Sequence, residues 1–353
     1  TVLVDRRAYP LFSILFGFGM AIMASRTMER ERRAAADTFS AEEVAGWHPV
    51  QRQIVEENIE RHVRRVAARL IRRRGLWMLV FGGVHALFFS GDIIGTYGLV
   101  AVLFAEVVVM KRAWPRVLVG SLVAALSLLG LWGTGFSMGG TPMVLEYHGP
   151  LAPTMFYPLT SLRTWLGATI ATVLLSLVVP CVMIGVGVAR WGVLQDPRGH
   201  GLVLACVAVG GLGVGVLGGL PFALMQLTWA FAGSAAWSYP LFHASGVLGA
   251  CGWLALLALV GGGPREKLGS VCAFLSAIGR RSMTAYLSQT AMFAGIFVIA
   301  PRLTGRSVSL GEAASAAVAV MVWLTTVVLC AVLERLGMPG PFEVLLRAAV
   351  ARS

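Results

Sequence analysis

The sequence predicts an all-α polytopic integral membrane protein, a helical bundle with about nine transmembrane helices. Of its 353 residues, 57% are hydrophobic and only 13% are charged, whereas a typical soluble domain has about 25% charged residues. Uncharged stretches such as 164–188 and 241–260 reach the roughly 20 apolar residues that cross a bilayer as a helix. The charged residues lie mainly between these stretches. We therefore expect one transmembrane domain over residues 1–353.

The basic loops predict the orientation of the spans, because Lys and Arg near membrane ends are retained in the cytoplasm. The polar segment 26–74 is rich in arginine and is expected on the cytoplasmic side, whereas loops 138–163 and 222–240 carry few charges and are expected outside. This topology places residues 1–10 outside, so we expect a further span before them in the full protein. The expected spans are 11–25, 75–90, 92–110, 117–137, 164–189, 201–221, 241–260, 283–300 and 313–333.

Within the cytoplasmic segment 26–74, residues 49–74 have the pattern of an amphipathic helix. Val50, Ile54, Ile59 and Val63 recur at roughly helical spacing, with Arg and Glu between them. A basic amphipathic helix beside a bilayer commonly lies in the plane of the headgroups. We expect a membrane-surface helix here; the alternative is that it helps to hold an anionic cytoplasmic ligand.

The net charge of +12 has a simpler explanation than nucleic-acid binding, because the spans leave no soluble domain to bind nucleic acid. Basic residues at helix ends instead fit contacts with anionic membrane lipids. None of the five cysteines forms a Cys-x-x-Cys pair, and no His-Glu-x-x-His sequence occurs, so we expect no metal site. The phosphate-binding loop of ATPases and the Gly-x-Ser-x-Gly elbow of serine hydrolases are also missing.

The most informative local sequence is GLWMLVFGGVHALFFSGDIIGTYGLV, residues 75–100. His85 lies in one expected span, Asp92 begins the next, and a tight turn at the outer side joins the two antiparallel helices. An ionisable residue inside a span is costly and indicates function. A carboxylate beside the ring would orient it and support its protonated state, as a general base requires. The alternative is structural: His85 bonds to backbone or to Asp92, and Asp92 only caps its helix.

Two arginine clusters at cytoplasmic helix ends are the best candidates for binding an anion, because guanidinium groups pair well with phosphates. The alternative is that they only mark the cytoplasmic side. Glu106 also lies within an apolar stretch, and we expect it to pair with a basic neighbour or to reach the membrane surface. The candidate anion-binding residues are Arg72, Arg73, Arg74, Arg280 and Arg281.

Four sequence blocks in order resemble the YeiB-like bacterial membrane proteins, which carry domain of unknown function 418. They are PLFSILFGFGMAI (10–22), the block at 75–100, AIGRRSMTAYLSQT (277–290) and GPFEVLLRAAV (340–350). Together they cover most of the chain, although each alone is a modest apolar match. The resemblance implies a multi-pass protein of the bacterial inner (plasma) membrane.

That family is similar to the heparan-glucosaminide acetyltransferases, which are transmembrane acyltransferases. The resemblance implies transfer of an acyl group from cytoplasmic acyl-coenzyme A, with acetyl-coenzyme A as the expected donor, to an acceptor across the membrane. It also implies that the two arginine clusters face the coenzyme's phosphates and that His85 acts as base or transient acyl carrier. The early span in which the lysosomal enzymes carry their catalytic histidine has no counterpart in this sequence, so the assignment to His85 is our inference.

Two other functions remain open from the sequence. Scattered intramembrane polar residues and glycine-rich helices also fit a transporter or exporter of a small or lipid-like molecule. The other open function is that of a non-catalytic membrane protein that holds other subunits together. The sequence specifies neither the acceptor nor the oligomeric state, and a homo-oligomer is compatible with it.

Overall fold

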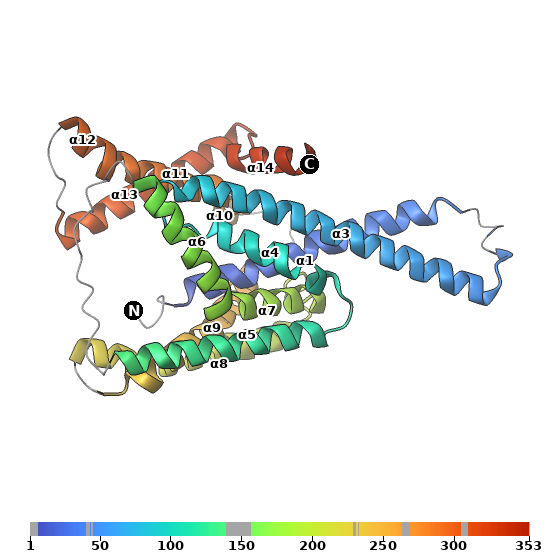
Figure 1. The fold of residues 1–353 in the computed structure, drawn as a ribbon, viewed down its shortest axis with the longest axis horizontal. Coiled ribbons are helices and arrows are strands. Elements are labelled where there is room, and N and C mark those ends of the chain that lie inside the picture. The colour runs from blue at the N-terminus through green and yellow to red at the C-terminus, as the bar shows by residue number, and fades with distance from the viewer. Residues whose placement is uncertain are drawn as a thin grey trace. The chain divides into compact units, whose positions relative to one another are not determined.

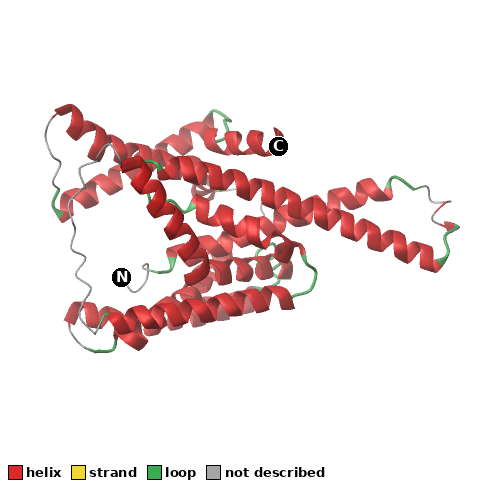
Figure 2. Ribbon diagram, viewed as in Figure 1, coloured by secondary structure: helices red, strands yellow, loops and turns green. Residues whose placement is uncertain are grey.

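All of the regular structure that is described in this protein is helical. The computed structural model describes residues 6–39, 43, 45–138, 157–228, 231, 233–262, 269–304 and 310–352. Within these ranges there are helices, turns and loops and no strand (Figure 2). The all-α prediction is therefore confirmed, and the apolar character of the helices supports a membrane protein.

Figure 1 labels the helices in their order along the chain. The first eight are α1 (Ala8–Ala36), α3 (Pro49–Ala86), α4 (Ile94–Val109), α5 (Trp114–Ser137), α6 (Tyr157–Leu175), α7 (Val178–Trp191), α8 (Gly201–Thr228) and α9 (Ala235–Gly261). After them come α10 (Ser270–Arg280), α11 (Ser282–Ala294), the π-helix η1 (Gly295–Ile299), α12 (Ala300–Thr304), α13 (Glu312–Arg335) and α14 (Pro341–Arg352).

The predicted count of nine spans is not confirmed. Among the described residues, six helices are long and apolar enough to cross a membrane, or seven if one bent pair counts as a single span. The expected span 92–110 corresponds to α4, which has 16 residues; a helix of that length rises about 24 Å, less than the roughly 30 Å of hydrocarbon. The expected span 75–90 is only the apolar end of α3, which ends at Ala86.

The expected continuous span 164–189 is two helices. α6 and α7 meet at a break and are bent by 59°. At the break, the Val178 N–H donates to the Ser176 hydroxyl at 3.3 Å. Pro180, which has no backbone N–H, lies in the first turn of α7, a position where a helix tolerates proline. Sequence hydropathy alone does not detect such a break, because every residue around it is apolar or small.

The helices form two compact units, each built from three separate stretches of sequence. Unit 1 comprises residues 1–76, 96–144 and 169–264, and unit 2 comprises residues 77–95, 145–168 and 265–353. Each unit is described by itself below. The expectation of a single transmembrane domain stays a prediction.

In unit 1, glycines allow helices to pack with their backbones close together. An added Cβ at Gly185 of α7 would lie 1.9 Å from the Ile14 carbonyl oxygen of α1. At Gly211 of α8, it would lie 2.6 Å from the Leu248 carbonyl oxygen of α9, and Figure 1 shows α8 and α9 side by side. The glycine-rich runs are therefore packing features, as small residues commonly are between membrane helices.

The amphipathic segment 49–74 is helical, and its predicted start at Pro49 is confirmed. The helix does not end near residue 74, however, but continues without a break to Ala86. The N-terminal part of α3 lies antiparallel to the C-terminal part of α1 (Figure 1). The apolar stripe is split: Val63 is fully buried, whereas Val50 and Ile54 are more than half exposed. Near Val63, the apolar residues of α3 therefore pack against neighbouring helices.

Candidate functional site

The structure brings His85 and Asp92 together within unit 2. His85 lies in the last turn of α3, and Asp92 lies in the turn just before α4. The His85 Nδ1 atom and the Asp92 Oδ1 atom are 2.8 Å apart. Both residues are buried, with exposed fractions of 7% for His85 and 4% for Asp92. The tight turn between two helices therefore does what the sequence predicted and places the imidazole against the carboxylate.

The second oxygen of Asp92 holds the carboxylate in place. Asp92 Oδ2 accepts the Gly95 backbone N–H at 2.8 Å and the Trp165 indole N–H at 3.3 Å. Asp92 therefore accepts a backbone N–H at the start of α4 and also bonds to His85, a geometry that fits both the functional and the structural alternative raised by the sequence. A carboxylate without a proton only accepts hydrogen bonds, so in a His85–Asp92 hydrogen bond of that kind Nδ1 is the donor and Nε2 is the second ring nitrogen, which faces away from Asp92.

Glycine makes room for this arrangement. An added Cβ at Gly82 would lie 2.6 Å from Asp92 Oδ2, and one at Gly95 would lie 2.3 Å from the Trp165 ring. Ser161, one turn before Trp165 on α6, donates to the Ala86 carbonyl at 2.6 Å. The start of α6 is therefore tied to the end of α3, which fixes the indole beside the carboxylate.

The imidazole of His85 also contacts two aromatic rings. Its centroid is 5.3 Å from the Tyr286 ring of α11, in an edge-to-face arrangement, and 5.8 Å from the Phe89 ring. The blocks 75–100 and 277–290, far apart in the sequence, thus meet at this site. Neither Trp165 nor Tyr286 was predicted, because only the tertiary packing of α6 and α11 places them here.

The Nε2 atom of His85 is buried and has no hydrogen-bond partner among the described residues. Buried polar atoms are nearly always bonded, so an unbonded one needs an explanation. A ring whose Nδ1 is held by a carboxylate and whose Nε2 is left open is chemically equipped to accept a proton at Nε2.

The predicted arginine cluster at 72–74 lies on α3 in unit 1. Arg72 Nη2 pairs with the Glu106 carboxylate at 2.8 Å, so Glu106 has a basic partner, as expected. Arg74 Nη1 lies 3.5 Å from the Met23 sulfur, and Arg73 also has interaction partners. These contacts fit a role in holding α3 against its neighbours as well as a role in anion binding.

The second arginine cluster lies in unit 2 between α10 and α11. Arg280 and Arg281 both pair with Glu334 of α13, Arg281 at 2.6 Å. Arg281 is buried and also donates to the Met338 carbonyl, with its Nε at 3.1 Å, and to the Ala277 carbonyl at 3.2 Å. These bonds make Arg281 a clamp between α10 and α13, whereas Arg280 is more exposed.

Glu343 of α14 caps the start of α11, a contact that the sequence did not predict. Its Oε1 atom accepts the Met283 N–H at 2.8 Å and the Thr284 N–H at 3.0 Å. The first N–H groups of a helix have no partner within the helix, and a carboxylate also suits the positive end of the helix dipole. The blocks 277–290 and 340–350 are therefore joined by this cap.

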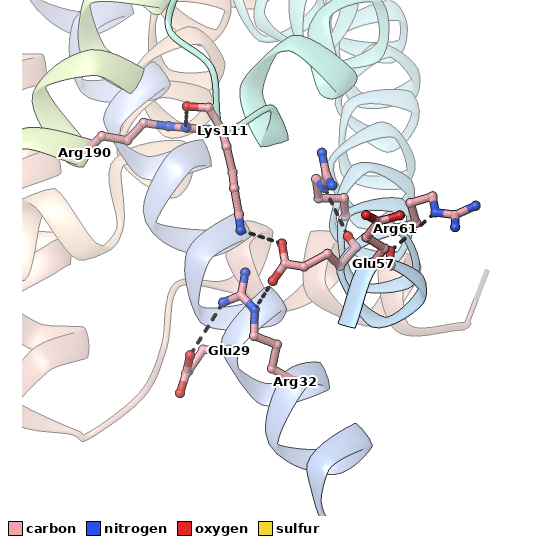
Figure 3. Close-up of polar contacts among 8 residues, drawn as sticks. Glu29, Arg32, Glu57, Arg61, Lys111 and Arg190 are labelled. Atoms are coloured by element: carbon pink, nitrogen blue, oxygen red, sulfur yellow. Dashed lines mark hydrogen bonds and ion pairs between the residues drawn. The ribbon is translucent and has the colours of Figure 1, made fainter. Parts of the chain in front are cut away.

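Glu60 of α3 is the centre of a charged network in unit 1, and Figure 3 labels its partners Arg32 and Lys111. It pairs with Arg32 of α1 at 2.5 Å and with Lys111, in the α4–α5 connection, at 2.9 Å. Arg190 of α7 donates to the Lys111 carbonyl at 3.1 Å. The hydrogen bond from Arg32 and the nearby Lys111 charge lower the pKa of Glu60 to about 2. The network joins α1, α3, the α4–α5 connection and α7.

No group of three or more His, Cys, Asp or Glu side chains suited to a metal ion occurs in the part of the chain that the structure describes. The expected outer loop 138–163 falls mostly on residues 139–156, which lie outside the described residues.

The comparisons with known proteins identify a family for the C-terminal part of the chain. Residues 188–353 match the family described as "Protein of unknown function (DUF418)". No curated protein and no solved structure matches the chain. The match includes Tyr286, both arginines of the second cluster and the Glu343 cap, whereas His85 and Asp92 precede it. This match over residues 188–353 supports the DUF418 family that the sequence blocks predicted.

Proposed function

We propose that this protein is an integral-membrane acyltransferase. It would take an acyl group from acyl-coenzyme A on the cytoplasmic side and transfer it to an acceptor on the outer side of the membrane. The main support is the buried His85–Asp92 pair, whose Nε2 atom has no hydrogen-bond partner among the described residues. The DUF418 family, which the chain resembles, is similar to transmembrane acyltransferases, and this similarity supports the same reaction class. We place the protein in the bacterial inner (plasma) membrane.

In the proposed reaction, a hydroxyl oxygen or amine nitrogen of the acceptor attacks the thioester carbonyl carbon, while His85 Nε2 takes its proton. The carbon–sulfur bond then breaks, and coenzyme A leaves as a thiolate with the bonding electron pair. The thiolate takes the proton back from the imidazolium, and the acyl group stays on the acceptor. Asp92 stabilises the imidazolium through Nδ1, as the carboxylate of a His–Asp pair does.

The phosphates of the coenzyme need cationic contacts at the cytoplasmic side. Arg72, Arg73, Arg74 and Arg280 are the candidates that we retain for this role. Arg281 contributes less, because its guanidinium is already bonded to Glu334 and two backbone carbonyls.

The first test measures release of the coenzyme A thiol from acetyl-coenzyme A by purified protein in nanodiscs, with D-glucosamine as the acceptor probe. We expect H85A to lower the rate by about 10²–10⁴-fold, the usual contribution of a general base, while acetyl-coenzyme A still binds. H85Q keeps a polar contact to Asp92 but cannot take the proton, so it should lose activity to a similar extent.

The matched control is H243A, because His243 is a second buried histidine within a helix and is not part of the proposed site. Its thiol release should equal that of the wild type. An H85A variant with wild-type turnover and an unchanged melting temperature would remove His85 from the mechanism. Absence of both binding and thiol release in the wild type would contradict the acyltransferase proposal itself.

Transport of a small or lipid-like molecule is the second candidate. The bend of 59° between α6 and α7 supports it, because broken helices form substrate sites in many transporters. Substrate-dependent flux in proteoliposomes that contain no acyl donor, undiminished in H85A, would favour transport over acyl transfer.

A further inference from the structure

A groove runs between α5 and α7 on the surface of unit 1. Its cavity volume is about 480 Å³. Gly120 and Gly187 leave space along its floor, and an added Cβ at Gly187 would have no atom within 4 Å. The other side chains along its length are mainly apolar, among them Val117, Ala124, Met183 and Ile184. In a membrane, such a groove is open to lipid chains.

Two arginines line one end of this groove, Arg116 of α5 and Arg190 of α7. Arg116 Nη1 donates to the Met110 and Arg112 carbonyls at 2.8 and 2.9 Å. Arg190 donates to the Lys111 carbonyl at 3.1 Å (Figure 3) and to the Val108 carbonyl at 2.6 Å. Both side chains are therefore fixed by backbone acceptors rather than by a carboxylate.

Within the described part of the chain, neither of these two arginines forms an ion pair. Two neighbouring guanidinium groups repel each other, so an anion between them is stabilising. Trp191, which is 77% exposed, also lines this end of the groove, and Trp114, next in sequence to the lining residue Ala113, is 59% exposed. Exposed tryptophans are typical of the membrane–water interface, so the arginines lie at the depth of lipid headgroups.

We propose that this groove is a binding site for one anionic phospholipid of the cytoplasmic leaflet. The headgroup phosphate lies between Arg116 and Arg190, and an acyl chain follows the apolar groove between α5 and α7. A free phosphate would leave the apolar length of the groove uncovered. A zwitterionic lipid carries its own cation beside the phosphate, which the two guanidinium groups repel. The combination of paired arginines and apolar groove therefore selects an anionic lipid.

The test is native mass spectrometry of the purified full chain, exchanged into detergent with equal amounts of phosphatidylglycerol and phosphatidylcholine. We expect one retained phosphatidylglycerol in preference to phosphatidylcholine. Each arginine near a membrane surface contributes about a fivefold gain in affinity for anionic lipid. R190Q should therefore weaken retention of phosphatidylglycerol about fivefold, and R116Q/R190Q further.

G187L tests the groove separately from the charges, because the new side chain enters space that is open in the wild type and blocks the acyl chain. It should lose the retained lipid with no change in melting temperature. The matched control is R198Q, which removes an exposed arginine of the α7–α8 connection and should retain lipid as the wild type does. Equal retention of both lipids by the wild type, or wild-type retention by both R190Q and G187L, would overturn the proposal.

Discussion

Among single residues, Glu60 joins three segments of unit 1: α1, α3 and the α4–α5 connection. Its carboxylate lies between a guanidinium of α1 and an ammonium of the α4–α5 connection, and its side chain is 21% exposed. An exposed ion pair contributes little to stability, but a partly buried network of three charges contributes more. Glu60 thus holds the paired ends of α1 and α3 together.

E60Q should loosen this helix pair. Loss of the charge removes about 1 kcal/mol, which corresponds to amide hydrogen exchange about fivefold faster in residues 26–36 and 49–66. The matched control is E56Q, one turn earlier on α3, where the exposed Glu56 forms no ion pair within the described residues. Equal exchange in E60Q and E56Q would contradict a stabilising role for Glu60.

The same carboxylate predicts a pH dependence for the α1–α3 pair. The pKa of Glu60 is lowered from its ordinary 4.5 to about 2 in the folded protein. A lowered carboxyl pKa stabilises the fold fully above the ordinary value and loses this contribution as pH falls toward the folded value. As the pH falls from about 4.5 to 2, the opening of residues 26–36 measured by hydrogen exchange should therefore become more frequent in the wild type. E60Q should not show this pH-dependent increase.

Among contacts of individual residues, the sequence predicts those between residues that are close together in the chain. His85 and Asp92 are seven residues apart across one turn, so their pairing followed from helix geometry. Trp165, Tyr286 and Glu343 come from distant segments, and nothing in a single sequence specifies which helix faces lie together. For Glu106, the sequence predicted only that a basic residue would lie nearby, and the structure identifies that residue as Arg72.

Among the elements, α1 and α7 make the closest approach in unit 1. A methyl group at position 185 would lie 1.9 Å from the Ile14 carbonyl oxygen and 2.9 Å from the Phe18 nitrogen. These are backbone atoms, so the clash is relieved only by moving a whole helix. Close contact of two backbones is what stabilises helix pairs where lipid removes the hydrophobic driving force.

G185A should therefore destabilise the protein by about 3 kcal/mol, the upper part of the usual range for overpacking. Thermal unfolding in detergent, followed by circular dichroism, measures this as a lower melting temperature. G187A is the matched control, because it lies two residues away on the same helix and its methyl group meets open space. A melting temperature for G185A as high as that of G187A would show that α1 and α7 are not packed as described.

Hydropathy predicted most helices but few of their ends. The start of α3 at Pro49 followed from the sequence, since proline is favoured in the first turn of a helix. The continuation of α3 into the apolar segment, and the break between α6 and α7, depend on packing around residues 74 and 176. A change from polar to apolar residues therefore does not mark a helix boundary in this chain.

For the whole molecule, the distribution of charge is the feature that relates the chain to the membrane. In unit 1 the basic connections predicted to be cytoplasmic meet one another: Lys111 contacts both Glu60 and Arg190. These contacts gather the charges in one part of unit 1, and the positive-inside rule predicts that this part faces the cytoplasm. The number of spans could not be predicted equally well, since α3 and α4 contain short apolar stretches that hydropathy counts as full crossings.

The orientation is tested by labelling introduced cysteines, after replacement of the five native cysteines by alanine. In right-side-out vesicles, a membrane-impermeant maleimide should label F231C, in the expected outer loop 222–240. R198C, in the α7–α8 connection, should react only after the vesicles are permeabilised. Both positions are exposed, so a difference in labelling reports sidedness. The reverse pattern would invert the topology.

The cap on α11 also constrains biosynthesis. The N–H groups of Met283 and Thr284 are satisfied by a carboxylate that the ribosome adds about sixty residues later, near the end of the chain. Until α14 has emerged, the first turn of α11 has only water or lipid headgroups as acceptors. A nascent chain arrested before Glu343 would thus lack this cap on α11, and assembly of unit 2 requires α14.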